Sequence, residues 1–309
     1  MGNIMNNTEL SIKCIVEKQM NTAVSKMYPI GKGASSSVYC AEIKSEPYKL
    51  AVKMSEHYDA TLREKEMLDF LSSRVSYKVP KTYFVCRENG ISYLAMELIE
   101  GISGKNVAKL FFLPNKKHLA NNIVDAFMNT QSFHNDKFGK FDNPAYDTWK
   151  KYYNDFFNPI YKFTKEKYKS NEVSKTVMNA VQLIYDNFDL IFDDAKGEPT
   201  LCHGDFWMPN MVIDFKKSEL AGVIDPFNII YAEPEYELFS LTLGFGKKLK
   251  LYDIYKSRVS VSKYCDLKVE LYALCNELDW YMWLNSIGHN YIKFRAENLI
   301  NQFRKLDIK

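Results

Sequence analysis

One stretch of polar residues constrains this chain more than any other feature. It reads His203-Gly204-Asp205-Phe206-Trp207-Met208-Pro209-Asn210. Asp225 follows fifteen residues after Asn210, and the residues between them have the pattern of a β-hairpin. A hairpin returns the chain to the point where it started, so the sequence predicts that Asp225 lies beside Asn210.

These three polar side chains suit phosphoryl transfer. The reaction needs little covalent chemistry from the protein and depends on charges held in fixed positions. A carboxylate can face an acceptor hydroxyl, while amide and carboxylate oxygens are ligands that Mg²⁺ prefers. The alternative interpretation makes His203 to Asp205 a plain turn and Asp225 a strand cap, and it is less favoured once the other ordered motifs are counted.

A loop of small residues, centred on Gly31 and Gly33, precedes this motif. It continues through Ser35 and Ser36 into a strand that begins near Val38. Glycines let backbone amides approach phosphate oxygens, but a G-x-G turn alone is equally typical of a hairpin. The loop therefore indicates a nucleotide site only in the context of the other motifs.

A lysine in an apolar strand is the next element. Lys53 follows Leu50-Ala51-Val52, so the strand carries an ammonium group that needs an acidic partner. Glu64 on the following helix is the candidate, with Glu66 as the alternative. Together, Lys53 and Glu64 form a pair suited to the α- and β-phosphates. Without the other motifs, a strand-end lysine and a solvated helix face explain the same residues.

The secondary-structure pattern changes near residue 100. Before it, strand-like runs at 37–43, 49–54, 83–87 and 91–97 surround one helical stretch at 60–71, and Asn89-Gly90 predicts a type I′ hairpin turn. After it, amphipathic stretches at 117–133, 145–168, 173–192, 235–255 and 267–303 predict helices. We expect an α+β protein with a small antiparallel β lobe (1–99) and a mainly helical lobe (100–309).

Taken together, these motifs resemble the aminoglycoside phosphotransferase family, a relative of the eukaryotic-type protein kinases. The resemblance covers nearly the whole chain and implies a bilobal protein-kinase-like fold that uses ATP, or GTP as an alternative, with Mg²⁺. It implies that Asp205 orients and deprotonates the acceptor hydroxyl, and that Asn210 and Asp225 bind the metal. The residues implied in nucleotide binding are Gly31, Gly33, Ser35, Ser36, Val38, Lys53, Glu64, and the hinge residues Met96, Glu97 and Ile99.

Departures from the protein kinases bear on the substrate. The chain has Asp225-Pro226-Phe227 where those kinases have Asp-Phe-Gly, and no Ala-Pro-Glu segment follows. A protein substrate is therefore not expected. The Asp-Pro form is also similar to fructosamine kinases, so three hypotheses remain: an antibiotic or amino-sugar kinase, a metabolic kinase of a fructosamine, choline or similar alcohol, and a catalytically inactive kinase-fold protein.

Carboxylates and aromatic rings follow the catalytic motif in the sequence. A cationic acceptor would need both kinds of group. The candidates are Trp207, Glu233, Glu235, Glu237, Glu277, Asp279 and Trp280. The alternative is that the tryptophans belong to the core and the glutamates face water.

Composition limits the possible partners and the cellular location of the protein. The 41 basic and 38 acidic residues are well mixed, which argues against a nucleic-acid partner. No apolar run approaches the roughly 18 residues of a membrane span, so no membrane partner is expected. The six cysteines are widely spaced, as is typical of reduced thiols, and the N-terminal sequence has no secretory signal. These features predict a cytoplasmic enzyme with a small-molecule partner.

Overall fold

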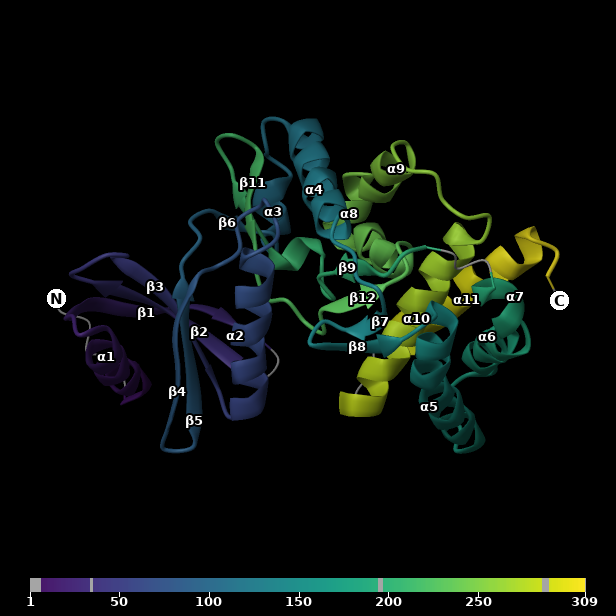
Figure 1. Ribbon diagram of the computed structural model, residues 1–309, viewed down its shortest axis with the longest axis horizontal. Helices are drawn as coiled ribbons and strands as arrows, with labels where there is room; N and C mark the ends of the chain where they lie inside the picture. Colours follow the sequence, from purple (N-terminus) through teal and green to yellow (C-terminus); the bar gives the residue numbers. More distant parts are fainter. Residues whose placement is uncertain (1–6, 34–35, 194–196, 285–288, 309) are drawn as a thin grey trace. The chain divides into compact units, whose positions relative to one another are not determined.

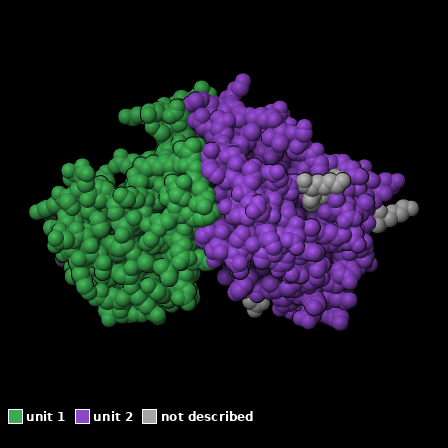
Figure 2. All heavy atoms as spheres, in the orientation of Figure 1, with its two compact units in different colours: residues 1–115, 209–227 green, residues 116–208, 228–309 purple. Residues whose placement is uncertain are grey.

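The computed structural model describes residues 7–33, 36–193, 197–284 and 289–308 (Figure 1). The chain divides into two compact units (Figure 2). Unit 1 comprises residues 1–115 and 209–227, and unit 2 comprises residues 116–208 and 228–309. The units differ from the predicted division after residue 99, because segments 100–115 and 209–227 pack with the N-terminal residues.

Unit 1 is built on a five-stranded antiparallel sheet with the order β1-β2-β3-β5-β4. Its strands are β1 (Val24–Lys32), β2 (Ser36–Ile43), β3 (Lys49–Ser55), β4 (Thr82–Glu88) and β5 (Ile91–Glu97). Asn89 and Gly90 both have positive φ, 51° and 81°, as the predicted type I′ turn between β4 and β5 requires.

Two longer helices accompany this sheet, α1 (Asn7–Met20) and α2 (Tyr58–Ser72). Helix α2 corresponds to the predicted helix. Helix α1 was not predicted, and it packs Ile12, Ile15 and Val16 into a core with Val52 and other sheet residues. One side of the sheet is thereby removed from water, as a half-apolar sheet requires.

A second, three-stranded sheet completes unit 1, with the order β11-β10-β6. It consists of β6 (Ile102–Ser103), β10 (Met211–Asp214) and β11 (Glu219–Val223), and the short helix α3 (Val107–Leu110) follows β6. The predicted hairpin over 211–224 is therefore present. Its pairing with β6 explains why residues 209–227 belong to unit 1.

Unit 2 is mainly helical, as predicted. Its longer helices are α4 (Lys116–Gln131), α5 (Trp149–Lys169), α6 (Lys175–Asp186), α10 (Cys265–Leu284) and α11 (His289–Lys305). Its small sheet has the order β8-β7-β12-β9, from β7 (Phe138–Lys140), β8 (Asn143–Tyr146), β9 (Thr200–Cys202) and β12 (Ile230–Ala232). Aromatic side chains including Trp149, Tyr153 and Tyr272 fill the core.

Short helices occupy the rest of unit 2. They are α7 (Phe188–Phe192), the 3₁₀ segment η2 (Tyr236–Thr242), α8 (Gly244–Lys248) and α9 (Leu251–Lys256), while the 3₁₀ segment η1 (Met208–Asn210) begins in unit 2 and ends in unit 1. The predicted helix over 235–255 is thus three pieces. Gly244 and Lys250 stand at the breaks with φ of 50° and 57°, a left-handed conformation that cannot continue an α-helix. None of the described helices has both the length and the apolar character needed to cross a bilayer.

Candidate active site

Lys53 lies between two carboxylates in unit 1. Its strand, β3, pairs on both sides, with Val38 of β2 and Leu94 of β5 opposite Lys53. The Nζ atom is 2.7 Å from Glu64 Oε2 and 2.7 Å from Asp225 Oδ1. Glu64, and not the alternative Glu66, is therefore the helical partner.

Burial and charge oppose each other at this cluster. Burial acts to lower the pKa of Lys53, but the charges and hydrogen bonds of Glu64 and Asp225 outweigh it, so the pKa of Lys53 is raised and the ammonium is retained. Burial raises the pKa of Glu64, against the effect of Lys53. The side chain of Lys53 is only 16% exposed, which makes it a positioned cation and not a mobile surface lysine.

The hairpin brings Asn210 and Asp225 together. The backbone N–H of Ile224 donates to the carbonyl oxygen of Asn210 at 2.8 Å, and Met211 pairs with Val223 at the start of the ladder. Asp225 then adopts φ of +58°, an uncommon conformation for a residue with a side chain. Backbone held in this way is frequent at functional sites.

The side chains present fit a Mg²⁺ ion carried by a nucleotide. Among the described residues, no three His, Cys, Asp or Glu side chains gather into a metal cage. Mg²⁺ is usually held by one or two protein oxygens, with phosphate oxygens and water completing its octahedron. One amide at Asn210 and one carboxylate at Asp225, beside the ammonium of Lys53, match that type of site.

The predicted nucleotide loop connects β1 and β2. Gly31 pairs with Val38, and the backbone N–H of Gly33 donates to the carbonyl oxygen of Ser36 at 2.8 Å. A Cβ atom at Gly33 would lie 3.0 Å from Ser36 Oγ, so a larger residue there requires the Ser36 side chain to shift. Ser35 lies outside the described residues.

The predicted hinge follows β5. Met96 and Ile99 are buried, and the side chain of Glu97 pairs with Lys78. The backbone N–H of Glu97 also has a partner, the carbonyl oxygen of Lys81 at 2.8 Å, so neither this N–H nor the carboxylate is available for the predicted contact with a purine base. Ile99 packs on Gly222 of β11, where a Cβ atom would lie 2.6 Å from Ile99 Cδ1.

The catalytic motif lies in unit 2 as far as Met208. Gly204 has φ of +85°, a conformation that favours glycine and turns the chain sharply before Asp205. The N–H of Asp205 donates to His203 Nδ1 at 3.3 Å, and the Asp205 carbonyl oxygen accepts from the N–H of Trp207 at 3.0 Å. The Asp205 side chain is partly exposed. Phe206 anchors the loop, with its ring 5.3 Å from that of Phe127.

The buried carboxylate of Glu237 binds the backbone of this loop and does not line an acceptor pocket. Its Oε2 accepts from the N–H of His203 at 2.9 Å, and its Oε1 accepts from the N–H of Phe206 at 3.1 Å. Burial raises the pKa of Glu237 to about 8, although these backbone donors act in the opposite direction. The carboxylate is occupied by backbone, so the predicted substrate role of Glu237 is corrected to a positioning role.

Glu233 and Glu235 are likewise internal. Lys268 Nζ lies 2.8 Å from Glu233 Oε2 and 3.2 Å from Glu235 Oε2, and the Tyr272 hydroxyl donates to Glu233. Glu235 also accepts from the N–H and hydroxyl of Ser262. The predicted substrate role of both glutamates is therefore wrong. The sequence carried one signal, since Lys268 stands between Leu267 and Val269 and is the single basic residue of α10.

The other predicted acceptor residues are more accessible. Trp207 is partly exposed, yet its Nε1 is buried and has no hydrogen-bond partner within the described part of the chain. Trp280 is 40% exposed at the end of α10. Burial raises the pKa of Glu277, opposed by Arg295, and burial also raises the pKa of Asp279. These four residues remain candidates for an acceptor pocket.

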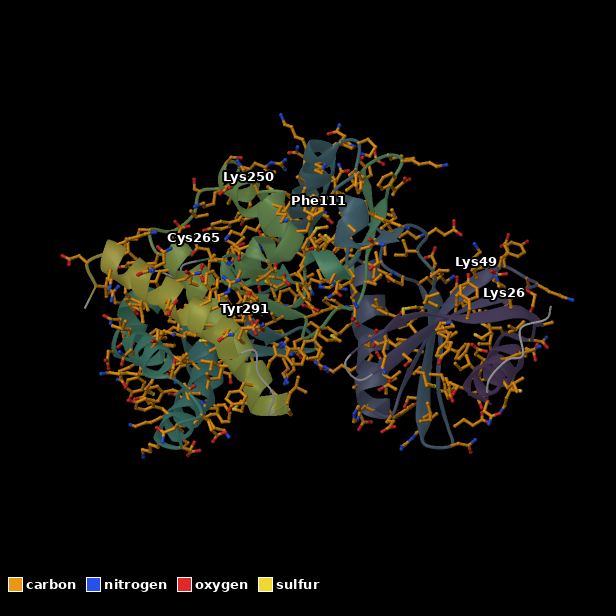
Figure 3. The ribbon with its side chains drawn as sticks, turned by 180° about the vertical axis from the view of Figure 1, so that it is seen from behind. Lys26, Lys49, Phe111, Lys250, Cys265 and Tyr291 are labelled. Atoms are coloured by element: carbon orange, nitrogen blue, oxygen red, sulfur yellow. The ribbon has the colours of Figure 1, made fainter. Side chains whose placement is uncertain are left out.

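A separate cavity of about 380 Å³ lies within unit 2, between the η2–α9 segment and the helices α10 and α11. Lys250 and Tyr291, labelled in Figure 3, belong to its lining, and so does the ion pair of Arg295 with Glu270. None of the predicted site residues lines this cavity. It is distinct from the catalytic motif.

Solved structures share this fold over nearly the whole chain. A thermostable mutant of aminoglycoside phosphotransferase APH(4)-Ia, in ternary complex with AMP-PNP and hygromycin B, has a TM-score of 0.70 at 14% identity and covers 94% of this chain and 98% of its own. A putative fructosamine-3-kinase from Haemophilus somnus 129PT has a TM-score of 0.67 at 14% identity and covers 95% of this chain and 99% of its own. The streptomycin–ATP–APH(2")-IIa ternary complex has a TM-score of 0.63 at 19% identity and covers 96% of this chain and 99% of its own.

The fold is of the protein-kinase-like class, and the match of the chain to a family model shows a small-molecule phosphotransferase. The chain belongs to the fructosamine kinase family, whose model matches residues 8–305. Among curated proteins, none matches it in sequence at a significant level. The predicted family resemblance and fold class are confirmed.

Proposed function

We propose that this protein transfers the γ-phosphate of ATP to a hydroxyl group of a small cationic molecule. The observation that supports this most strongly is the placement of Lys53 between Glu64 and Asp225, with Asn210 beside Asp225 on the hairpin. This arrangement would hold the α- and β-phosphates by the ammonium and the metal by the two oxygen ligands. Bound Mg²⁺ would neutralise charge on the phosphates.

Asp205 is the proposed catalytic base. Its carboxylate accepts the proton of the acceptor hydroxyl while the new oxygen–phosphorus bond forms and the bond to the leaving ADP breaks. Glu237 supports this role indirectly, because it fixes the backbone on both sides of Asp205.

The proposed acceptor combines hydroxyl groups with an amine. Family membership supports a fructosamine, a sugar linked to an amine, over an aminoglycoside, which was the leading prediction from the sequence. An antibiotic-resistance role depends on the aminoglycoside alternative, and GTP remains the alternative phosphate donor. Glu277 and Asp279 are the carboxylates suited to pair with the ammonium group of either acceptor.

A substrate panel tests the proposal. ADP release is measured with Mg²⁺–ATP and, in turn, a fructosamine, an aminoglycoside and choline, using wild type, Asp205→Asn and the exposed control Asp136→Asn. We expect one acceptor to stimulate ADP release, Asp205→Asn to reduce kcat by at least about a hundredfold, and the control to match wild type. Nucleotide binding without stimulation by any acceptor would favour the catalytically inactive alternative.

A further inference from the structure

Unit 1 carries an exposed surface that combines aromatic rings with lysines, here called the lysine–phenylalanine surface. It consists of Phe111 and Phe112 after α3, with Lys105 and Lys109 on the same segment and Lys216 and Lys217 on the turn between β10 and β11. Phe112 is 79% exposed and Phe111 is 47% exposed. Figure 3 labels Phe111 on the segment that leads into α4.

Neighbouring residues fix these rings at the surface. Leu110 and Leu113, on either side of the phenylalanine pair, are almost completely buried. The side chain of Asn106 accepts from the N–H of Lys109 at 3.1 Å and begins the short helix. Phe111 and Phe112 therefore stand on an anchored segment, which means that their exposure is not caused by fraying.

The segment and the hairpin turn are tied together at two points. The N–H of Gly104 donates to the carbonyl oxygen of Met211 at 2.8 Å, next to the pairing of β6 with β10. At the other end, the N–H of Asn115 donates to Ser218 Oγ at 3.1 Å. The lysines of the turn and those of the segment consequently border the same part of unit 1.

The charge of this surface is one-sided. The sequence has no Asp or Glu between Gly101 and Val124. On the hairpin, the acidic residues are Asp214, whose Oδ1 accepts from the backbone N–H groups of Lys216 and Lys217, and Glu219. Among the described residues, none of the four lysines forms an ion pair, and they outnumber these two acidic residues.

We propose that the lysine–phenylalanine surface docks on an anionic lipid bilayer. Aromatic side chains partition into the boundary between headgroups and acyl chains, while lysines beside them are attracted to acidic headgroups. Single-stranded nucleic acid is the competing partner. It is disfavoured because the surface has no arginine, the residue best suited to recognise bases and phosphates.

This binding is peripheral and differs from a membrane span. The sequence alone predicted no membrane partner, because it has no apolar run long enough for a membrane span. A search for apolar runs cannot detect this surface, because its two rings and four lysines come from segments about one hundred residues apart. The proposal does not depend on the identity of the phosphorylated substrate, because none of these six residues belongs to the nucleotide or catalytic site.

Vesicle flotation with the full chain tests the proposal. Vesicles of phosphatidylcholine alone are compared with vesicles containing about 30% phosphatidylserine, at low and high salt. We expect binding only to the anionic vesicles, weakening as salt increases. Each lysine should contribute roughly fivefold to the partition coefficient, so Lys216→Glu/Lys217→Glu should reduce it at least twentyfold or so. Phe112→Ser should reduce it about tenfold.

Matched variants distinguish a specific surface from general attraction. Lys162→Glu/Lys169→Glu on α5 makes the same change in net charge, and Leu190→Ser removes another exposed apolar side chain. Both should bind like wild type, and thermal unfolding should confirm that every variant is folded. The proposal is wrong if wild type does not bind anionic vesicles at low salt, or if the α5 variant loses as much binding as Lys216→Glu/Lys217→Glu. If wild type instead binds single-stranded RNA preferentially, and the variants of the lysine–phenylalanine surface lose that binding, the partner is a nucleic acid and not a bilayer.

Discussion

At the scale of single residues, Lys268 is a buried cation inside unit 2. It is 1% exposed and contacts Glu233 and Glu235. Removing one partner of a buried ionic cluster leaves the others uncompensated, at a cost of about 3–5 kcal/mol. We expect Lys268→Met to lower the free energy of unfolding by this amount in urea titrations at pH 7.

The control is a lysine whose ion pair is in water. Lys293 lies 3.9 Å from Glu297, and both side chains are about half exposed. Lys293→Met should change the free energy of unfolding by less than about 0.5 kcal/mol. Equal effects of the two substitutions would mean that the buried cluster adds nothing beyond an ordinary surface pair.

Glu237 makes stability depend on pH. Its pKa is about 8 in the folded protein, against 4.5 for an ordinary glutamate, so the folded state binds more protons than the unfolded state between these values. The stabilisation is complete below pH 4.5 and is lost as the pH rises through 8. The slope at intermediate pH is about −1.4 kcal/mol per pH unit.

Glu237→Gln removes the titrating group with little change in shape. Urea titrations from pH 5.5 to 7.5 should therefore show wild type losing stability relative to the variant as pH increases. Parallel curves would contradict a raised pKa. If Glu237 positions the catalytic loop, the variant should also lower kcat more than it raises KM for the acceptor, since the damage lies at the backbone around Asp205.

Some site residues could be predicted from local sequence and others could not. Lys53 and Glu64 were predicted because a lysine in an apolar strand needs an acidic partner, and the hairpin was predicted from the spacing of Asn210 and Asp225. Glu233 and Glu235 were misassigned, because their partner Lys268 lies more than thirty residues away on α10. Which carboxylates lose their water is decided by packing, and local sequence does not encode it.

At the scale of elements, α1 stabilises unit 1 by covering one side of the sheet. Ile12 is completely buried, while Leu10 on the same helix is 46% exposed. Ile12→Ala should lower the free energy of unfolding by roughly 3 kcal/mol through lost burial and a residual cavity. Leu10→Ala, the matched control, should stay within about 0.5 kcal/mol. Chemical denaturation followed by circular dichroism measures both, and similar losses would mean that α1 is not docked.

The same helix shows the limit of pattern-based prediction. Strands β2 to β5 were predicted because alternation and turn residues mark them locally. Helix α1 has an apolar stripe of only three buried residues, Ile12, Ile15 and Val16, in a polar segment. Its stability comes from the sheet beneath it, in the way that tertiary packing usually supports short helices.

At the scale of the whole molecule, the discontinuity of unit 1 decides which fragments can fold. Residues 1–115 lack β10, which pairs with β6, and β11, which packs on Ile99 of the hinge. The contact is close at Gly222, where a Cβ atom would lie 2.8 Å from the carbonyl oxygen of Lys78. The fragment also lacks Asn210 and Asp225, the proposed metal ligands.

We therefore expect fragment 1–115 to unfold without cooperativity and to bind no Mg²⁺–AMP-PNP. Joining residues 209–227 to it through a flexible linker should restore a cooperative thermal transition, because the three-stranded sheet can form again. Calorimetric titration should then detect nucleotide binding that Asp225→Asn weakens at least tenfold, since one carboxylate ligand is lost. A fragment 1–115 that melts cooperatively and binds the nucleotide alone would show that the hairpin is dispensable, and the nucleotide site would then have to be sought within the N-terminal sheet.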